Sequence, residues 1–273
     1  MTPGVISNAL AASAAFSLIA ERYDETFTRT TIGRAQRRVV WDALTQAFSP
    51  GDHVLELNCG TGEDALFLAR RGISLTACDA SPAMVAIAER RKSLEAAESN
   101  LEFRVLANEE LHKLRGQCIF DGAFSNFSGL NCVADIREVA ANLGLLLRTG
   151  APLLICLSTR VCVWEILWYL AHANLRSAFR RTGGHTIAQV EGVSVPVWYP
   201  TIGGIRRTLA PWFGLRSVRA VGLFVPPSYV EAWAHRHERF ISALVKMDQL
   251  FARFPILCGV GDHVLLQFER AQS

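Results

Sequence analysis

The sharpest chemical pattern in the sequence is a glycine-rich segment, VLELNCGTG, at residues 54–62. An apolar run leads into Gly60 and Gly62, and a second apolar run ends at Asp79, roughly 20 residues after the turn. Glycines let the backbone approach a ligand closely. A carboxylate at a strand end can accept both hydrogen bonds from a ribose diol. This order of strand, turn and acid indicates a nucleotide-binding βαβ unit rather than a structural turn alone.

The elements that position these residues alternate along the chain. Apolar runs bounded by turn signals predict strands at 53–57, 74–78, 101–106, 120–125 and 153–157, and amphipathic or capped runs predict helices at 64–71, 82–97 and 136–147. Two later strands are expected at 216–223 and 263–269. Because strands that alternate with helices form parallel sheets with right-handed crossovers, we expect an α/β fold with a doubly wound, mostly parallel seven-stranded sheet and flanking helices.

The glycine turn and Asp79 resemble motifs I and II of the class I, Rossmann-like S-adenosylmethionine-dependent methyltransferases of the small-molecule type, and residues 23–158 follow the plan of that family. The resemblance implies S-adenosyl-L-methionine as cofactor and a turn that holds its methionine part. Asn58 replaces the first glycine of the family pattern, but Asn tolerates a positive φ better than most residues. The cofactor-binding residues that the resemblance implies are Tyr23, Glu56, Asn58, Cys59, Gly60, Gly62, Asp79, Ala80, Met84, Asn108, Glu109, Ser125, Asn126 and Phe127.

Several of these residues have a second interpretation. The resemblance places Met84 on the adenine, yet Met84 is equally at home in a helix core. Asn108 stands where family members often carry an adenine-binding Asp, although a surface position explains an amide almost as well. Tyr23 resembles an N-terminal residue that closes over the cofactor, or simply packs its helix. Ser125 to Phe127 resemble motif IV and are expected beside the donor methyl group.

A dinucleotide-dependent dehydrogenase is the natural rival for any glycine-rich βαβ unit. Its G-x-G-x-x-G fingerprint needs a third small residue, and Ala65 can take that place. Glu63 and Asp64, however, put two negative charges where a pyrophosphate binds. A sulfonium amino acid carries no phosphate, so the electrostatics favour the methyltransferase.

Three regions follow from the pattern. Residues 1–50 are expected to form an N-terminal helical lid, 51–158 the cofactor-binding core, and 159–273 a substrate cap interleaved with the last strands of the sheet. In the cap we expect a long helix at 161–181, a hairpin at 186–199, and helices at 202–209 and 227–251. The basic residues Arg176, Arg180 and Arg181 read as a solvated helix end.

The cap carries what little the sequence says of the acceptor. All six tryptophans follow Ser158, which favours a small, apolar or aromatic acceptor methylated on O, N or C. If a base is needed, the candidates are Tyr199, His185, His235, His237 and Tyr229, each of which is more often a surface or packing residue. Two alternatives stay open: a cofactor-binding, non-catalytic partner protein, or a methyltransferase of membrane lipids that uses the 161–181 helix.

Composition narrows the remaining classes. The net charge is only +3 and half of the residues are hydrophobic, so a globular protein without a nucleic-acid partner is expected. The seven cysteines are odd in number and scattered, without the spacing of a disulfide framework or a zinc site. No run is long enough for stable membrane insertion. The expected location is the reducing cytoplasm, and no metal is expected.

Overall fold

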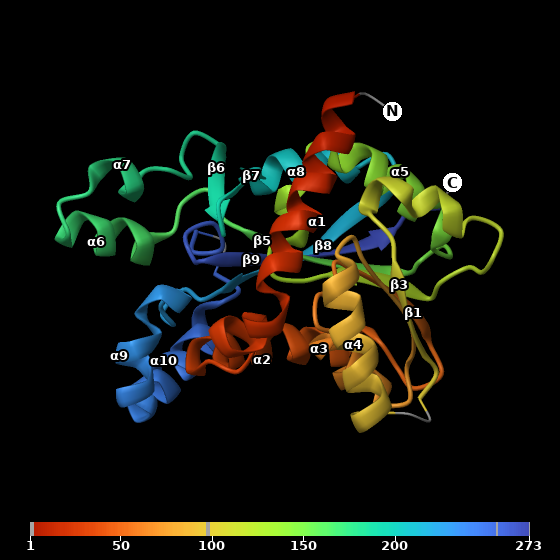
Figure 1. Cartoon of the computed structure of the whole chain (residues 1–273), viewed down its shortest axis with the longest axis horizontal. Helices are drawn as coiled ribbons and strands as arrows, with labels where there is room; N and C mark the ends of the chain where they lie inside the picture. Colours follow the sequence, from red (N-terminus) through yellow and green to blue (C-terminus); the bar gives the residue numbers. More distant parts are fainter. Residues whose placement is uncertain (1–2, 97–98, 255, 273) are drawn as a thin grey trace.

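A seven-stranded sheet forms the centre of the molecule (Figure 1). The computed structural model describes residues 3–96, 99–254 and 256–272. The strand order is β3-β2-β1-β4-β5-β9-β8, in which only β9 runs antiparallel to its neighbours β5 and β8. The strands are β1 (His53–Leu57), β2 (Ser74–Asp79), β3 (Leu101–Val105), β4 (Gly122–Ser125), β5 (Pro152–Ser158), β8 (Phe213–Val221) and β9 (His263–Arg270). The predicted doubly wound, mostly parallel sheet is confirmed.

Helices cover both faces of this sheet, and alternate strand residues face opposite layers. Leu55 and Leu57 of β1 join one core cluster with α5 and α8, whereas Val54 joins a second cluster with α2 and α3. The strand order reverses between β1 and β4, which is where open α/β sheets bind ligands. The helices of these layers are α1 (Pro3–Tyr23), α2 (Thr31–Ala47), α3 (Glu63–Ala69), α4 (Pro82–Glu95), α5 (Ile136–Leu146) and α8 (Ile202–Leu209), with a π-helix η1 (Asp24–Thr28) and 3₁₀ turns η2 (Asn108–Leu114) and η3 (Gly129–Cys132).

Local chemistry explains where the helix after β2 begins. The Ser81 side chain accepts a hydrogen bond from the backbone N–H of Met84, and Pro82 occupies the first turn. Both features satisfy or remove backbone donors that a helix start leaves free. The predicted cap at Ser81-Pro82 is therefore confirmed, and it sets α4 directly behind Asp79.

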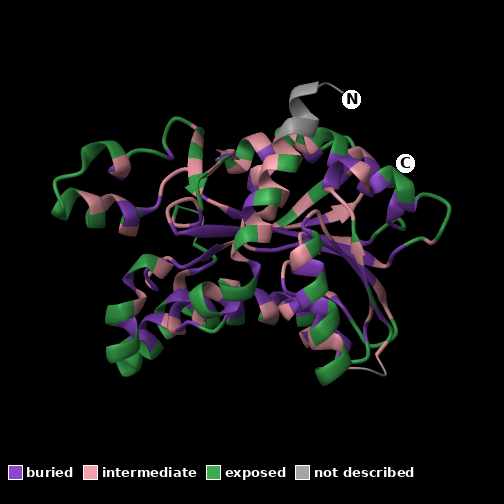
Figure 2. Cartoon of the chain, in the orientation of Figure 1, coloured by how far each residue is buried: buried purple, intermediate pink, exposed green. Residues whose placement is uncertain are grey.

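Most of the chain between β5 and β9 forms an insertion outside the sheet. It holds α6 (Val163–Ala171), α7 (Leu175–Ala178), a hairpin of β6 (His185–Val190) and β7 (Val193–Trp198), a 3₁₀ turn η4 (Ser228–Val230), α9 (Glu231–Arg236) and α10 (Glu238–Phe251). The hairpin turn is the predicted one: Glu191 and Gly192 have φ of +48° and +79°, as the twist of a two-residue hairpin requires. Figure 2 shows burial along the sheet and broad exposure on α6, α7, α9 and α10.

Two helix predictions in this insertion are wrong. The single helix expected at 161–181 is interrupted between α6 and α7, where Ala173 takes a positive φ of 54°. The helix expected at 227–251 is interrupted at His237, whose φ of −126° is outside the helical region. Apolar periodicity alone did not reveal either break, since both lie in sequences of helix-compatible residues.

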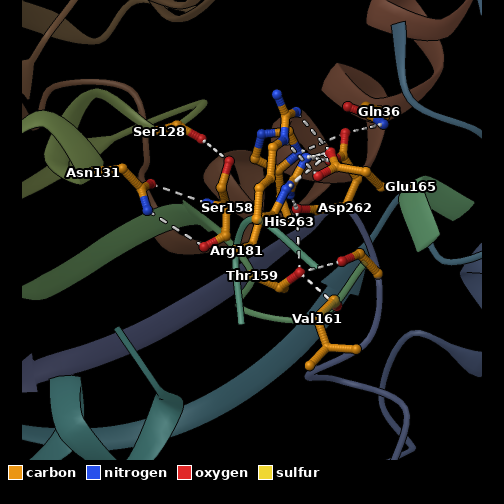
Figure 3. A network of polar contacts seen from close by, with 12 residues as sticks. Gln36, Ser128, Asn131, Ser158, Thr159, Val161, Glu165, Arg181, Asp262 and His263 are labelled. Carbon is orange, nitrogen blue, oxygen red and sulfur yellow. Dashed lines mark hydrogen bonds and ion pairs between the residues drawn. The ribbon is translucent and has the colours of Figure 1, made fainter. Parts of the chain in front are cut away.

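The expectation that Arg176, Arg180 and Arg181 mark a solvated helix end is wrong for Arg181, although Arg176 and Arg180 are exposed. Arg181 is buried and its Nη2 lies 2.6 Å from Glu165 Oε2 and 3.1 Å from Asp262 Oδ1. Arg180 Nε lies 2.8 Å from Glu165 Oε1. Figure 3 shows this network at the ends of β5 and β9. Two arginines and two carboxylates thereby tie α6 to the sheet.

Removing one partner of this network should destabilise the fold strongly. Arg181→Leu leaves Glu165 buried with a weaker counter-charge, which typically costs about 3–5 kcal/mol. Arg216→Leu is the matched control, because the Arg216–Glu269 pair is exposed on the sheet edge and such pairs contribute roughly 0–1 kcal/mol. Urea unfolding measures both. Equal losses in the two variants would contradict the anchoring role of Arg181.

Candidate active site

The turn after β1 has the backbone conformation of a ligand-binding loop. Asn58, Gly60 and Gly62 take positive φ values of 57°, 53° and 78°. Asn58 therefore adopts the conformation that the sequence predicted for it. A Cβ on Gly62 would lie 2.7 Å from Phe103 Cζ, so a larger residue there is excluded by packing as well as by φ.

Asp79 clamps this turn against the start of α4. Its Oδ2 accepts a hydrogen bond from the Gly60 N–H at 2.9 Å, and its Oδ1 accepts one from the Ser81 N–H at 2.8 Å. Burial raises the pKa of the Asp79 carboxyl above its ordinary value. A carboxylate has about four acceptor positions, so two backbone bonds leave room for hydroxyl donors. The acid at the end of β2 thus faces the turn and retains free acceptor capacity.

A cavity of about 230 Å³ lies in front of this clamp. Of the fourteen cofactor-binding residues expected from the sequence, eight line it: Tyr23, Asn58, Gly60, Asp79, Ala80, Met84, Asn126 and Phe127. These residues lie at the end of α1, at the ends of β1, β2 and β4, and in α4. The structure therefore brings together the expected residues of four separate segments at the switch point of the sheet.

The other six expected residues do not line this cavity. Cys59 and Gly62 belong to the turn itself, and Ser125 supports it by donating from Oγ to Asn58 Oδ1 at 3.1 Å. Asn108 and Glu109 are buried at the start of η2, beyond β3. Glu56 lies beneath the turn, 2% exposed.

Buried acceptors near the turn fit a cationic ligand. Among the described residues, Glu56 Oε2 and Asn126 Oδ1 are buried and accept no hydrogen bond. Burial, together with the charge of Asp64, raises the pKa of Glu56 well above its ordinary range. Unpaired buried acceptors are costly. The ammonium group of S-adenosylmethionine can donate hydrogen bonds to such acceptors, and its sulfonium adds a second positive charge. These acceptors therefore fit S-adenosylmethionine, whose methionine part carries both cations.

Three segments that line the cavity were not expected from the sequence. They are the α1 residues Ala12, Ser13 and Phe16, the η3 region with Ser128, Gly129 and Cys132, and four hairpin residues, Ala188, Val190, Val195 and Val197. The hairpin itself was predicted, but its position over the cavity depends on the packing of β7 against α1. No spacing in the sequence signals that contact.

Helix α1 closes the cavity by hydrogen bonds to the segment after β2. Ser13 Oγ donates to the Ala80 carbonyl at 2.7 Å, and the hydroxyls of Ser17 and Ser81 lie 2.7 Å apart. The π-helix η1 follows directly, and Thr61 Oγ1 donates to its Asp24 at 2.6 Å. Because π-helical turns are frequent at functional sites, we propose that α1 is the lid of this site.

The acidic residues at the start of α3 are already paired with arginines. Arg37 Nη1 lies 2.6 Å from Asp64 Oδ1, and Arg91 Nη2 lies 2.5 Å from Glu63 Oε2. Asn126 Nδ2 also donates to Asp64, at 2.9 Å. The two charges that argued against a dinucleotide are therefore largely neutralised, and that electrostatic argument loses its force. The choice between the two cofactors depends instead on the similarity of this chain to known proteins.

The base candidates from the sequence lie elsewhere, and none lines the cavity. His235 and His237 are exposed near the end of α9. Tyr229 packs on Trp168 and Tyr169, and exposed His185 lies against Trp198; Tyr199 is buried, with the Arg181 guanidinium over its ring.

A histidine that the sequence did not single out lies nearer the cavity. The imidazole of His263, at the start of β9, packs edge-to-face on Phe127 with 5.7 Å between ring centres. Burial lowers the pKa of His263, and its Nδ1 lies 3.4 Å from Asp262 Oδ2. No motif marks this residue, because only the antiparallel return of β9 beside β5 brings it to the site.

Part of the chain is similar in sequence to known methyltransferases. Residues 54–150 match the family model described as "Methyltransferase domain". The demethylmenaquinone methyltransferase of Thermobifida fusca (strain YX) is 32% identical over 145 residues, and that of Beutenbergia cavernae is 40% identical over 79 residues. The first match covers 53% of this chain and 59% of the relative, the second 28% and 32%. The chain thus matches no more than about three fifths of the length of either relative.

Solved structures share the fold over most of the chain. A putative S-adenosylmethionine-dependent methyltransferase from Listeria monocytogenes superposes with a TM-score of 0.60 at 15% identity, covering 85% of this chain and 96% of that one. Magnesium protoporphyrin IX methyltransferase from Synechocystis PCC 6803, with bound S-adenosylhomocysteine, gives 0.61 at 14% identity, covering 97% and 100%. The chain therefore has the Rossmann-like fold of the class I S-adenosylmethionine-dependent methyltransferases, and its residues 54–150 match a methyltransferase domain. S-adenosylmethionine is the cofactor of this class.

Across the described part of the chain, no group of three or more His, Cys, Asp or Glu side chains is placed to hold a metal ion. In the same residues, no helix is long and apolar enough to cross a bilayer.

Removal of the Asp79 carboxylate should weaken cofactor binding. Asp79→Ala takes away the clamp on the Gly60 N–H and the free acceptor positions, so we expect S-adenosylhomocysteine to bind at least about tenfold more weakly, or about 1.4 kcal/mol. Calorimetric titration measures the effect. Asp135→Ala, which removes the cap of α5 instead, is the matched control. Unchanged affinity in Asp79→Ala would contradict the assignment.

Lowering the pH should reduce the free energy of unfolding through the buried imidazole of His263. The folded protein lowers the pKa of His263 below the unfolded value of about 6.5, so the unfolded state binds this proton more readily and stability is lost as the pH falls below that value. His263→Gln should flatten this loss between about pH 7 and about pH 5 in urea unfolding. Exposed His235→Gln is the control and should keep the wild-type slope.

Proposed function

We propose that this chain transfers the methyl group of S-adenosylmethionine to a small apolar acceptor, such as a quinone precursor with a hydroxylated aromatic ring. The observation that carries the proposal is the mixed lining of the cavity. The lining includes Asn58, Asp79 and Asn126, here called the polar wall, and four aliphatic side chains of the β6–β7 hairpin, here called the apolar wall. The names of the curated relatives, demethylmenaquinone methyltransferases, support an acceptor of this kind.

In this proposal the polar wall holds the cofactor. Asp79 accepts hydrogen bonds from the ribose hydroxyls, and the turn at 58–60 holds the methionine part. Met84 and Phe16, which belong to one apolar cluster beside the cavity, pack on the adenine. Asn126 and Phe127 then lie at the donor methyl group, because they follow the end of β4 next to the turn.

The apolar wall is proposed to hold the acceptor. Val195 is buried, and Ala188, Val190 and Val197 complete the same face of the hairpin. An apolar ring between this wall and the cofactor loses water on binding, which favours association in proportion to the area buried. Polar acceptors of the same size gain less and leave their polar groups without partners.

The chemistry required of the protein is alignment. The acceptor atom forms a bond to the methyl carbon as the sulfur–methyl bond breaks, S-adenosylhomocysteine leaves, and the acceptor's displaced proton passes to solvent. A reacting distance near 3 Å and correct orientation can lower such a barrier by roughly 7–11 kcal/mol. None of the base candidates from the sequence lines the cavity, so we assign them no catalytic role.

A labelled-methyl assay tests the proposal. We expect label to pass from S-adenosylmethionine to a hydroxynaphthoquinol that bears an apolar side chain, and far less to the same ring without that chain. Val195→Asp should raise the KM of the apolar acceptor by about tenfold or more, since a pocket contact of this kind contributes roughly 1–3 kcal/mol.

The control for this assay is Ser194→Asp, which adds the same charge one residue away on the exposed face of β7. It should keep the wild-type KM. If no S-adenosylhomocysteine forms with any apolar acceptor, the result would contradict the proposal and favour a non-catalytic, cofactor-binding partner protein. Equal KM values in the two variants would contradict the proposal that the hairpin forms part of the acceptor site.

A further inference from the structure

Helices α6 and α7 form a helical arm (residues 163–179) that projects from the end of the molecule (Figure 1, upper left). In α6 the one buried residue is an acid, Glu165. A surface helix of a globular protein normally buries its apolar side and exposes its charges, so this helix is inverted. The exposed apolar side chains of the arm are Val163 (41%), Leu167 (57%), Trp168 (36%), Leu170 (41%), Leu175 (65%) and Phe179 (48%).

The inversion is held in place from inside the molecule. Glu165 is 1% exposed and takes ion pairs from Arg180 and Arg181, and Arg181 continues to Asp262 at the sheet. The arm therefore cannot rotate its apolar side inward without breaking buried ion pairs. Large exposed apolar side chains gathered on one pair of helices are characteristic of an interaction site.

The charge of the surrounding region indicates what covers this surface. Residues 159–258 contain twelve Lys and Arg against five Asp and Glu, a net charge of +7, whereas the rest of the chain carries −4. On the arm itself Arg176 is exposed, and Glu165 is turned inward. An exposed apolar surface on a net-positive segment of the chain is complementary to anionic headgroups above an apolar layer.

Aromatic residues at the base of the arm fit the same environment. Trp168 and Tyr169 of α6 pack around Tyr229 with ring centres 5.7 and 6.0 Å apart. Trp and Tyr have apolar bodies and polar tips, which is why they gather where an apolar phase meets water. At nine and four residues, α6 and α7 lie on such a surface rather than cross it.

We propose that the arm docks on the surface of a membrane that contains anionic lipids, with its leucines and aromatic side chains in the interfacial layer. A second copy of the chain is the less favourable occupant, because a symmetric contact would bring two net-positive regions together. The arm is linked to the cavity through Arg181 and Asp262, whose neighbour His263 packs on Phe127. Docking therefore presents the site to lipid-borne acceptors, but the docking itself does not depend on the proposed methyl transfer.

Vesicle co-sedimentation without cofactor or acceptor tests the docking. The full chain should sediment with phosphatidylcholine vesicles that contain phosphatidylglycerol, and much less with pure phosphatidylcholine or at high salt, where charge is screened. The double variant Leu167→Asn/Leu175→Asn should lower the partition coefficient by about tenfold or more.

The matched control is Leu94→Asn/Ile119→Asn, which removes two apolar side chains outside the cap that are 81% and 60% exposed. It should bind as the wild type does, and both variants should keep the wild-type Tm and affinity for S-adenosylhomocysteine. Absence of wild-type binding, or equal loss in both variants, would overturn the proposal. The proposal would also be overturned if the wild type is a dimer that does not bind vesicles, and if the arm variant, but not the control, is a monomer.

Discussion

The candidate site depends on a backbone turn that only a specific set of contacts can hold. Three residues after β1 take positive φ, a conformation that most side chains disfavour. The Asp79 carboxylate bonds to Gly60 within this turn and to Ser81 at the start of α4. One side chain thus joins the ends of two strands to the first turn of a helix. The cavity, the orientation of Met84 and the bonds from α1 to Ala80 and Ser81 all follow from that clamp.

Around the clamp the protein builds a site from segments far apart in sequence. Helix α1 reaches Ala80 and Ser81, and the β6–β7 hairpin packs against α1. The polar layer of Arg37, Asp64 and Asn126 supports the turn from beneath. The same insertion that supplies the apolar wall of the cavity also carries the inverted arm, so binding of an apolar acceptor and contact with an apolar phase come from one part of the chain.

Much of the fold was predictable because its signals are local. The alternation of apolar runs and capped helices from 53 to 157, the positive φ of Asn58 and the hairpin turn at Glu191-Gly192 each depend on a few neighbouring residues. Eight expected cofactor residues line the cavity for the same reason: strand ends in a parallel sheet meet at one edge.

The rest depended on long-range packing. The hairpin's place over the cavity, the burial of Arg181 against Glu165 and the return of His263 to the ends of β4 and β5 join residues up to about two hundred positions apart. The helix breaks at Ala173 and His237 had no Gly or Pro to mark them. Periodicity reports which residues prefer burial, but it does not report which partner will bury them. For that reason a buried arginine network was mistaken for a solvated helix end.

The central claim is that one cavity, between the Asp79 clamp and the aliphatic face of the hairpin, holds the cofactor and the acceptor. A crystal structure of the chain with S-adenosylhomocysteine tests this most directly. The account predicts the ribose hydroxyls on Asp79, the homocysteine part on the 58–60 turn, and the sulfur facing Val195 and Val197. A ligand bound elsewhere on the chain, or one whose sulfur points away from the hairpin, would contradict it.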